Sequence, residues 1–329
     1  MDVFNNAPNN DSGKTDPNWE RSVLEKIALE GIAEQRRHRR WSIFFKLLGF
    51  AYLGLLMAVL VDWGGSVEKF GDGSRHTALV QLHGVIQAKG EASAEHVVSS
   101  LQAAFEDKAT QGVVLSINSP GGSPVQAGMI NDEIVRLRGK YPKVPLYVVV
   151  EDFCASGGYY VAAAADQIFV DKASVVGSIG VLMDGFGFTG TMEKLGVERR
   201  LLTAGENKGF LDPFSPQEAA HKAHAQQMLG DIHQQFIDVV RKGRGKRLKE
   251  TPEIFSGLMW SGARSIELGL ADGYGTVESV ARDIIKAEDI RDYTVKQNVA
   301  EKFARQFGAD MAESMAERAM NTLARFNLR

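Results

Sequence analysis

The chain has very little cysteine and almost no net charge. Its 329 residues include a single cysteine, Cys154, and carry a formal net charge of −3. One cysteine excludes any disulfide within the chain, so the hydrophobic core must hold the fold together. A near-neutral balance excludes a general attraction to nucleic acid or to an acidic partner. The length allows one large domain or two ordinary ones, with room for a tail.

Histidines are few, and they are not spaced as metal ligands. Of the 7 histidines, His221 and His224 share one predicted helix at positions i and i+3. No carboxylate triplet accompanies them, so we expect surface residues and no metal site. None of the histidines is flanked as the base of a catalytic triad usually is. If the chain holds an activated nucleophile, lysine is the remaining candidate for its base.

The N-terminal region combines a polar tail with a long apolar run. Residues 1–40 are polar, with residues 1–20 predicted to be disordered, and they end in the basic cluster RRHRR. The next segment, 41–63, reads WSIFFKLLGFAYLGLLMAVLVDW. Its apolar part, residues 42–61, has about the 20 residues that a membrane helix needs.

Trp41 and Trp63 bracket this segment, where interfacial aromatic residues belong, and Lys46 lies near enough to its start to reach the headgroups. We favour a bilayer anchor over a buried core helix, which is rarely apolar all round. A cleaved signal peptide would begin nearer residue 1 and be followed by a small-residue cleavage site. Because the basic cluster precedes the helix, we expect a cytoplasmic N-terminus, with residues 64–329 on the outer side of the membrane.

Beyond a Gly-rich linker at 64–76, apolar runs alternate with helical patterns. Strands are predicted at 77–86, 112–118 and 144–152 and as two short strands within 167–182, and helices at 93–107, 124–140, 156–166, 215–245 and 298–327. Strands that are continuous apolar runs, each followed by a helix, predict an α/β fold with a mostly parallel sheet. The last helix is amphipathic and indicates core packing or contact with another copy.

Two short stretches suggest nucleophilic catalysis. Ser156 precedes a Gly-Gly pair at the start of a predicted helix, where developing negative charge is favoured, although a plain helix cap is the commoner reason for such a serine. The SPGGS turn, 119–123, closes a buried strand and can present amides to an oxyanion, although it can also be an ordinary turn. Lys208 lies in a Gly-flanked loop. A lysine acts as a general base only in its neutral form, which burial favours.

Five motifs in order resemble bacterial signal peptide peptidase A in its short form. They are SINSPGG, ASGGYYVAAAAD, VGSIGV, TAGENKGFLDPFSP and GLMWSGARSIELGLADG. The resemblance implies a crotonase-like or ClpP-like fold of repeated ββα units, preceded by one transmembrane helix, and a serine protease with a Ser-Lys dyad. It divides the chain into a tail (1–40), an anchor (41–63), a linker (64–76), a protease domain (77–297) and a C-terminal helix (298–329).

The resemblance also implies roles for particular residues. Ser156 is the nucleophile, Lys208 the general base, and Ser178 the residue that orients the lysine. The amides of Gly157 and of Gly122, or of Gly121 in its place, hold the oxyanion. Cys154 is then a small buried residue beside the nucleophile.

The family further implies partners and a location. Its substrates are peptides, chiefly signal peptides left in the membrane after secretion, and no metal or organic cofactor is implied. A homo-oligomer, octameric in the short form, brings the sites to the contacts between protomers. The location is the bacterial inner membrane, crossed once, with the catalytic domain on the periplasmic side.

Three alternatives remain open on the sequence. A SohB-type membrane peptidase has the same serine and lysine and a different biological role. A crotonase-type acyl-CoA enzyme shares the fold and the oxyanion hole but belongs in the cytoplasm. A non-catalytic scaffold would be expected to have lost the dyad, and both residues are present.

Overall fold

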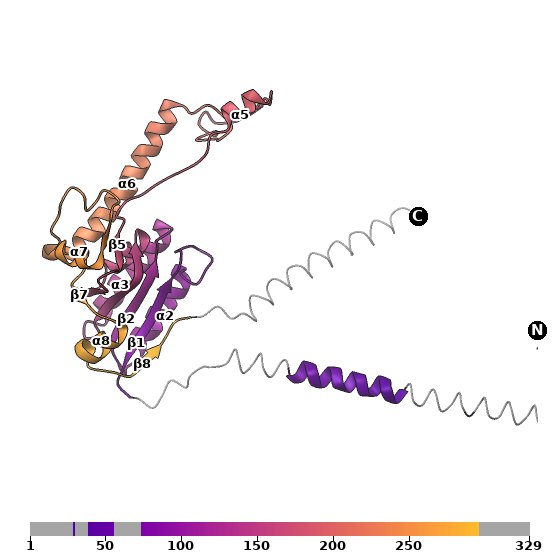
Figure 1. Cartoon of the computed structure of the whole chain (residues 1–329), viewed down its shortest axis with the longest axis vertical. Coiled ribbons are helices and arrows are strands. Elements are labelled where there is room, and N and C mark those ends of the chain that lie inside the picture. Colours follow the sequence, from indigo (N-terminus) through magenta and orange to yellow (C-terminus); the bar gives the residue numbers. More distant parts are fainter. Residues whose placement is uncertain (1–28, 30–38, 56–73, 296–329) are drawn as a thin grey trace, which may run out of the picture. The chain divides into compact units, whose positions relative to one another are not determined.

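The computed structural model of the chain describes residues 29, 39–55 and 74–295 (Figure 1). Residues 39–55 are helical and belong to a different part of the chain from 74–295, so each part is described by itself. The predicted anchor is therefore described as far as residue 55. Residues 56–63, nearly all of the predicted tail, most of the linker and the predicted C-terminal helix lie outside the described residues. Among the helices of the described ranges, none is long and apolar enough to cross a bilayer.

Residues 74–295 form an α/β fold around one mixed sheet. Its strands are β1 (His76–His83), β2 (Thr110–Ser119), β3 (Leu146–Ala155), β4 (Gln167–Val170), β5 (Val175–Gly177), β6 (Met259–Ser261), β7 (Gly273–Tyr274) and β8 (Ile290–Asp292). The main path through the sheet runs β6-β5-β3-β2-β1-β8, and β4 pairs with β3 and β7. Every pair is parallel except β5–β6, so the predicted mostly parallel sheet is confirmed.

Helices follow most of the strands, as the alternating pattern predicts. They are α2 (Ala94–Glu106), α3 (Pro124–Lys140), α4 (Gly157–Ala162), α5 (Thr189–Lys194), α6 (Ala219–Arg244), the 3₁₀ turn η1 (Gly245–Arg247), α7 (Gly262–Glu267), α8 (Val277–Ser279) and the π-helical turn η2 (Val280–Ile285). Side chains alternate between the two faces of the sheet. Val148 of β3 packs into the larger core with Leu101 of α2 and Ile134 of α3, while its neighbour Val149 packs with Val280 of η2 on the other face.

Strand β3 changes its partner halfway along, and this change builds the edge where the predicted nucleophile lies. Its first half pairs with β4, and its second half, Phe153–Ala155, pairs with β5. The register with β2 shifts at the same point, because Ile117 pairs with Val150 whereas Ser119 pairs with Cys154. The irregularity re-aims the end of β3, so that Ser156 emerges between the ends of β2 and β5.

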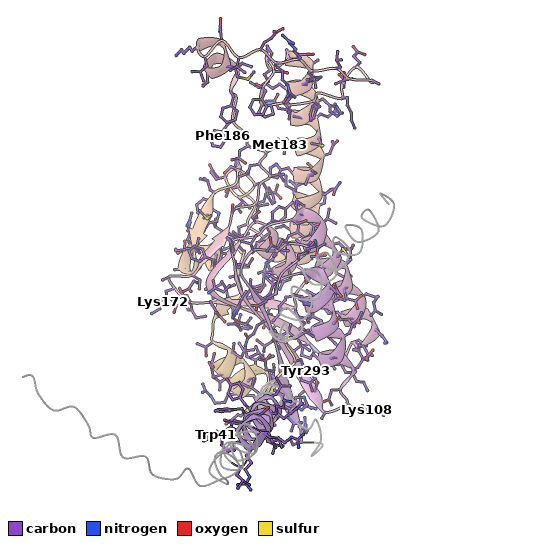
Figure 2. The ribbon with its side chains drawn as sticks, turned by 90° about the vertical axis from the view of Figure 1, so that its right-hand side faces the viewer. Trp41, Lys108, Lys172, Met183, Phe186 and Tyr293 are labelled. Atoms are coloured by element: carbon purple, nitrogen blue, oxygen red, sulfur yellow. The ribbon has the colours of Figure 1, made fainter. Side chains whose placement is uncertain are left out.

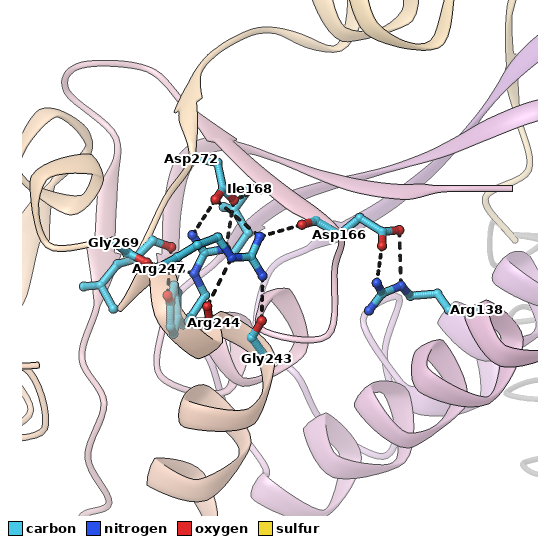
Figure 3. Close-up of polar contacts among 10 residues, drawn as sticks. Arg138, Asp166, Ile168, Gly243, Arg244, Arg247, Gly269 and Asp272 are labelled. Carbon is cyan, nitrogen blue, oxygen red and sulfur yellow. Dashed lines mark hydrogen bonds and ion pairs between the residues drawn. The ribbon is translucent and has the colours of Figure 1, made fainter. Parts of the chain in front are cut away.

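A buried ion pair fixes the C-terminal end of α6 to the sheet (Figure 3). Both terminal nitrogens of Arg244 lie 2.8 Å from Asp272 carboxylate oxygens, and its Nε donates to the Gly269 carbonyl. Asp272 also accepts from the Ile168 amide at 2.7 Å. Burial opposes ionisation of Asp272, but the hydrogen bonds and charges of Arg244, the Ile168 amide and Arg247 outweigh it. The pKa of this carboxyl therefore lies below its ordinary value.

The opposite end of α6 belongs to a protruding segment, residues 181–224, which we call the arm. Figure 1 shows α5 and the start of α6 away from the sheet. No residue from 181 to 224, all of which are described, is buried within this chain. Large apolar side chains lie open to solvent here, including Leu182 (81% exposed), Phe186 (79%) and Leu202 (96%). Figure 2 shows Phe186 at the outer part of the molecule.

Several element boundaries differ from the prediction, and two of these differences have a visible cause. The helix predicted from residue 215 begins at Ala219, because the Ser215 hydroxyl donates to Asp212 at 2.7 Å and residues 216–218 are not helical. The sequence predicts that the linker runs through His76, but His76 is the fully buried first residue of β1. Its Nε2 lies 2.9 Å from the Tyr293 hydroxyl.

Candidate active site

Ser156 stands on a sharp turn between β3 and α4. Its backbone has φ 53° and ψ −123°, a conformation that L-residues rarely adopt. Its amide donates to the Gly177 carbonyl at 2.8 Å. Although Ser156 occupies the N-cap position of α4, its side chain makes no capping hydrogen bond. The hydroxyl is therefore not committed to the helix, which weakens the explanation of this serine as a plain cap.

The SPGGS turn lies directly against Ser156. A Cβ placed on Gly121 would lie 2.7 Å from the Ser156 Cβ, so only glycine permits this approach. The Gly121 amide donates to the Ser119 hydroxyl at 3.1 Å and is already used. The carbonyl of Gly121 and the amide of Ser123 bond to Ile86. Of the amides of this turn from Gly121 to Ser123, the Gly122 amide is the one without a hydrogen bond to another described residue.

The amides of Gly122 and Gly157 lie side by side. A Cβ on Gly157 would be 3.3 Å from the Gly122 nitrogen. Within residues 74–295, neither amide donates to a protein acceptor. Two adjacent free N–H groups at the start of a helix, next to a serine hydroxyl, are what an oxyanion requires. This arrangement favours Gly122 over Gly121 as the second donor.

Ser178 directly follows Gly177, whose carbonyl accepts the hydrogen bond from the Ser156 amide. Its backbone also has a positive φ, 50°, and its amide donates to the Leu258 carbonyl at 2.8 Å. Because the Ser156 amide donates to Gly177, the two serines lie on adjoining backbone segments. The structure thus brings together Ser156, Ser178, Gly157 and Gly122.

Trp260 is a neighbour of this cluster to which sequence reasoning assigned no role. A Cβ on Gly177 would lie 3.1 Å from the indole Cδ1, so the ring covers that glycine. Its Nε1–H is buried, and no acceptor among the described residues contacts it. The antiparallel pairing of β6 with β5 brings Trp260 here. That pairing joins segments more than 80 residues apart, so no local sequence pattern predicts that Trp260 lies here.

Cys154 is fully buried in the core, as predicted for a small residue beside the nucleophile. Burial raises the pKa of its thiol far above the ordinary value. A thiol that stays protonated is a poor nucleophile.

Lys208 does not lie beside Ser156 and Ser178. It is exposed on the arm, where its amide donates to the Gly205 carbonyl at 3.1 Å. The preceding residue, Asn207, bonds to His221 in the first turn of α6. By contrast, His233 of the same helix reaches the Ile179 carbonyl, next to Ser178. His233 follows His221 by 12 residues, which is about 18 Å along a helix axis. Within one chain, the structure does not bring Lys208 to Ser156.

Positive backbone φ angles occur in each of the three segments that carry the predicted residues Ser156, Ser178 and Lys208. Among the described residues, four that are not glycine have a positive φ: Ser156, Ser178, Leu211 and Lys286. The first two are predicted site residues, and Leu211 lies three positions after Lys208. Such conformations cost about 1–3 kcal/mol each and concentrate at functional sites.

A cavity of about 640 Å³ lies beside β3 and β5, but none of the predicted site residues lines it. Its charged lining consists of Glu151, Asp152, Asp171 and Glu278. We therefore place the candidate site at the open edge formed by Ser156 and the two glycine amides, and not in this cavity.

Comparisons with known proteins show the family of the chain. The model of peptidase family S49 matches residues 139–291, which include Ser156, Ser178 and Lys208. A putative signal peptide peptidase SppA of Enterococcus faecium is 31% identical over 239 residues, covering 69% of each chain. The chain belongs to peptidase family S49. The resemblance to signal peptide peptidase A seen in the motifs is thereby confirmed, and the family with its protease-named relatives supports a serine protease.

Other relatives match over smaller shares of their length. A probable protease SohB of Haemophilus influenzae is 30% identical over 201 residues, covering 60% of this chain and 56% of its own. A protein of Brucella abortus named Na(+)/H(+) antiporter NhaA is 41% identical over 240 residues, 71% of this chain. The chain spans only 32% of that protein's length, so its name carries nothing over to this family S49 member.

Proposed function

We propose that the chain is a membrane-anchored serine endopeptidase with a Ser156–Lys208 dyad, which degrades signal peptides left after secretion and other small unfolded peptides. One observation carries the proposal. The Ser156 hydroxyl stands uncapped on a strained turn, beside two glycine amides that have no acceptor within residues 74–295. The finer fold assignment, a crotonase-like or ClpP-like domain, belongs to the same proposal.

The chemistry follows from these groups. The Ser156 Oγ attacks the carbonyl carbon of a peptide bond and gives its proton to the neutral Lys208 amine. The Gly122 and Gly157 amides stabilise the negative charge that develops on the carbonyl oxygen. The lysine then protonates the leaving amine, an acyl-enzyme remains on Ser156, and water hydrolyses it. Ser178 orients the lysine through its hydroxyl.

We infer that Lys208 comes from a second copy of the chain. Its own backbone is about 18 Å along α6 from the neighbourhood of Ser178, whereas a lysine side chain extends about 6 Å. The arm that carries Lys208 exposes apolar side chains such as Leu182 and Leu202, and such surfaces in soluble parts of proteins usually meet a partner. A ring of copies, an octamer by resemblance, lets each arm serve the next protomer. Packing there buries the lysine and favours its neutral form.

The anchor and the substrates are supported by separate observations. Helical residues 39–55 expose large apolar side chains, including Phe50 at 74%, as a lipid-facing helix does. A relative named a signal peptide peptidase supports apolar peptide substrates. We place the anchor at residues 42–61 in the inner membrane, with the catalytic domain on the periplasmic side.

The test is hydrolysis of a signal-peptide-like fluorogenic peptide by the purified full chain. Ser156→Ala and Lys208→Ala should each lower kcat by at least roughly a thousandfold. Matched controls are Ser93→Ala, which removes the cap of α2, and Lys222→Ala, which removes another exposed lysine of the arm. Both controls should retain activity. Near wild-type cleavage by either dyad variant would overturn the dyad.

A further inference from the structure

The loop that carries Lys208 is attached to the first turns of α6. The Nε2–H of His221 donates to the Asn207 side-chain oxygen at 3.1 Å, and Asn207 directly precedes Lys208. On the other side of the lysine, the Phe210 ring stands edge-on to His221, with ring centroids 5.4 Å apart. The backbone closes the turn, because the Phe210 amide donates to the Asn207 carbonyl at 3.0 Å.

His221 differs from its surroundings in how well it is covered. Its side chain is only 12% exposed, although no residue of the arm is buried. We predict His221 and His224 to be surface residues, and His221 is only partly exposed. His224 is exposed, and its ring also stands against Phe210, with centroids 5.6 Å apart. His224 makes no hydrogen bond to the loop among the described residues, so only His221 holds Asn207.

We propose that His221 is a positioning residue for Lys208, acting through its hydrogen bond to Asn207. The inference rests on the proposed role of Lys208 as the general base. A general base must lie within about 3 Å of the proton that it takes, so the loop has to present the amine in one place. The loop is flanked by Gly205 and Gly209, which do little to restrict its backbone. The Asn207–His221 bond supplies the restraint that the glycines lack.

The expected effect follows from the strength of one such bond. Loss of a neutral hydrogen bond costs an amount that corresponds to roughly a threefold to tenfold change in an equilibrium. Because the bond places the base and does not contact the substrate, the loss should appear in kcat and leave KM unchanged. A purely structural role would show itself in assembly or unfolding instead.

The experiment compares variants of the full chain on one fluorogenic peptide. His221→Ala removes the donor, and His221→Gln retains an N–H at a similar reach. His224→Ala is the matched control, because it removes the other ring packed on Phe210 and leaves the bond intact. Asn207→Ala breaks the same bond from the opposite side, and it decides the matter if His221→Ala fails to fold. Lys208→Ala is measured alongside.

We expect kcat to fall in His221→Ala and Asn207→Ala with KM unchanged, and to fall no further in the double variant. His221→Gln should recover most of the loss, and His224→Ala should match wild type. If His221→Ala folds, assembles and keeps its wild-type kcat, the inference is overturned. The same holds if His224→Ala loses as much as His221→Ala. An active Lys208→Ala would instead overturn the proposed function, so the two failures are distinguishable.

Discussion

A one-to-one mixture of Ser156→Ala and Lys208→Ala chains should recover proteolysis that neither chain has alone. Each variant lacks one half of the proposed dyad and keeps the other. If Lys208 serves the serine of a neighbouring copy, a Lys208→Ala protomer still offers an intact Ser156. A Ser156→Ala neighbour then brings its arm and supplies the lysine.

The distance between Lys208 and the Ser178 neighbourhood explains why the activity needs two copies, and random assembly of the two variants sets how much activity returns. Lys208 is attached to the start of α6, and the Ser178 neighbourhood contacts His233, about 18 Å further along the helix. A lysine side chain covers about a third of that distance. With random assembly, about a quarter of the sites pair an intact serine with an intact lysine. Activity should therefore return to about one quarter of the wild-type rate per chain.

The assay is peptide hydrolysis after the two variants have been refolded together, with oligomer size checked by light scattering. A second mixture, of wild type with the Ser156→Ala/Lys208→Ala double variant, sharpens the result. A dyad shared between copies predicts about one quarter in both mixtures. A dyad within one chain predicts no activity in the first and about one half in the second. No activity in the first mixture together with about one half in the second would refute the inference, drawn from the length of α6, that Lys208 serves a neighbouring copy.

Three further predictions concern the described residues around the site and the core. Asp272→Asn should lower the free energy of unfolding in urea by about 3–5 kcal/mol, because it leaves the fully buried Arg244 unpaired. Since the folded-state pKa of Asp272 is lowered, this contribution is present above about pH 4 and is lost as pH falls through the folded-state value. Gly122→Ala should abolish peptide hydrolysis, because its Cβ would stand 2.1 Å from the Ile86 carbonyl oxygen and displace the amide; unchanged kcat would contradict the oxyanion role. Cys154→Ser should keep kcat within a few-fold, and the wild-type thiol should react slowly with a thiol reagent in the folded protein; rapid inactivation by that reagent would contradict its burial.

Local sequence was enough for the central strands and the helices beside them. The helix predicted at 124–140 coincides with α3, because Ser123 caps it and Pro124 suits its first turn. The buried strands were readable as apolar runs. Each of these signals lies within one segment, so no distant contact is needed to interpret it.

At the start of α6, the local sequence pattern predicts the wrong first residue. Ser215 and Pro216 form a common helix-start pattern, yet the Ser215 hydroxyl binds Asp212, which also pairs with Arg199 across the arm. The carboxylate that accepts from Ser215 is thus paired with a residue more than ten positions away, which the local pattern does not show. The same kind of contact covers His221, which its sequence neighbourhood gives no reason to expect.

The sequence by itself identified the residue types of the site: a serine before two glycines, a Gly-Gly turn and a lysine in a Gly-flanked loop. Only the tertiary structure decided which amide is free, because that depends on the bonds of Gly121 to Ser119 and Ile86. It alone placed Lys208 far from Ser156, because that separation is set by the length of α6 and by the Arg244–Asp272 pair at its base. Both depend on how strands and helices distant in sequence pack, and a motif read along the chain carries no such distances.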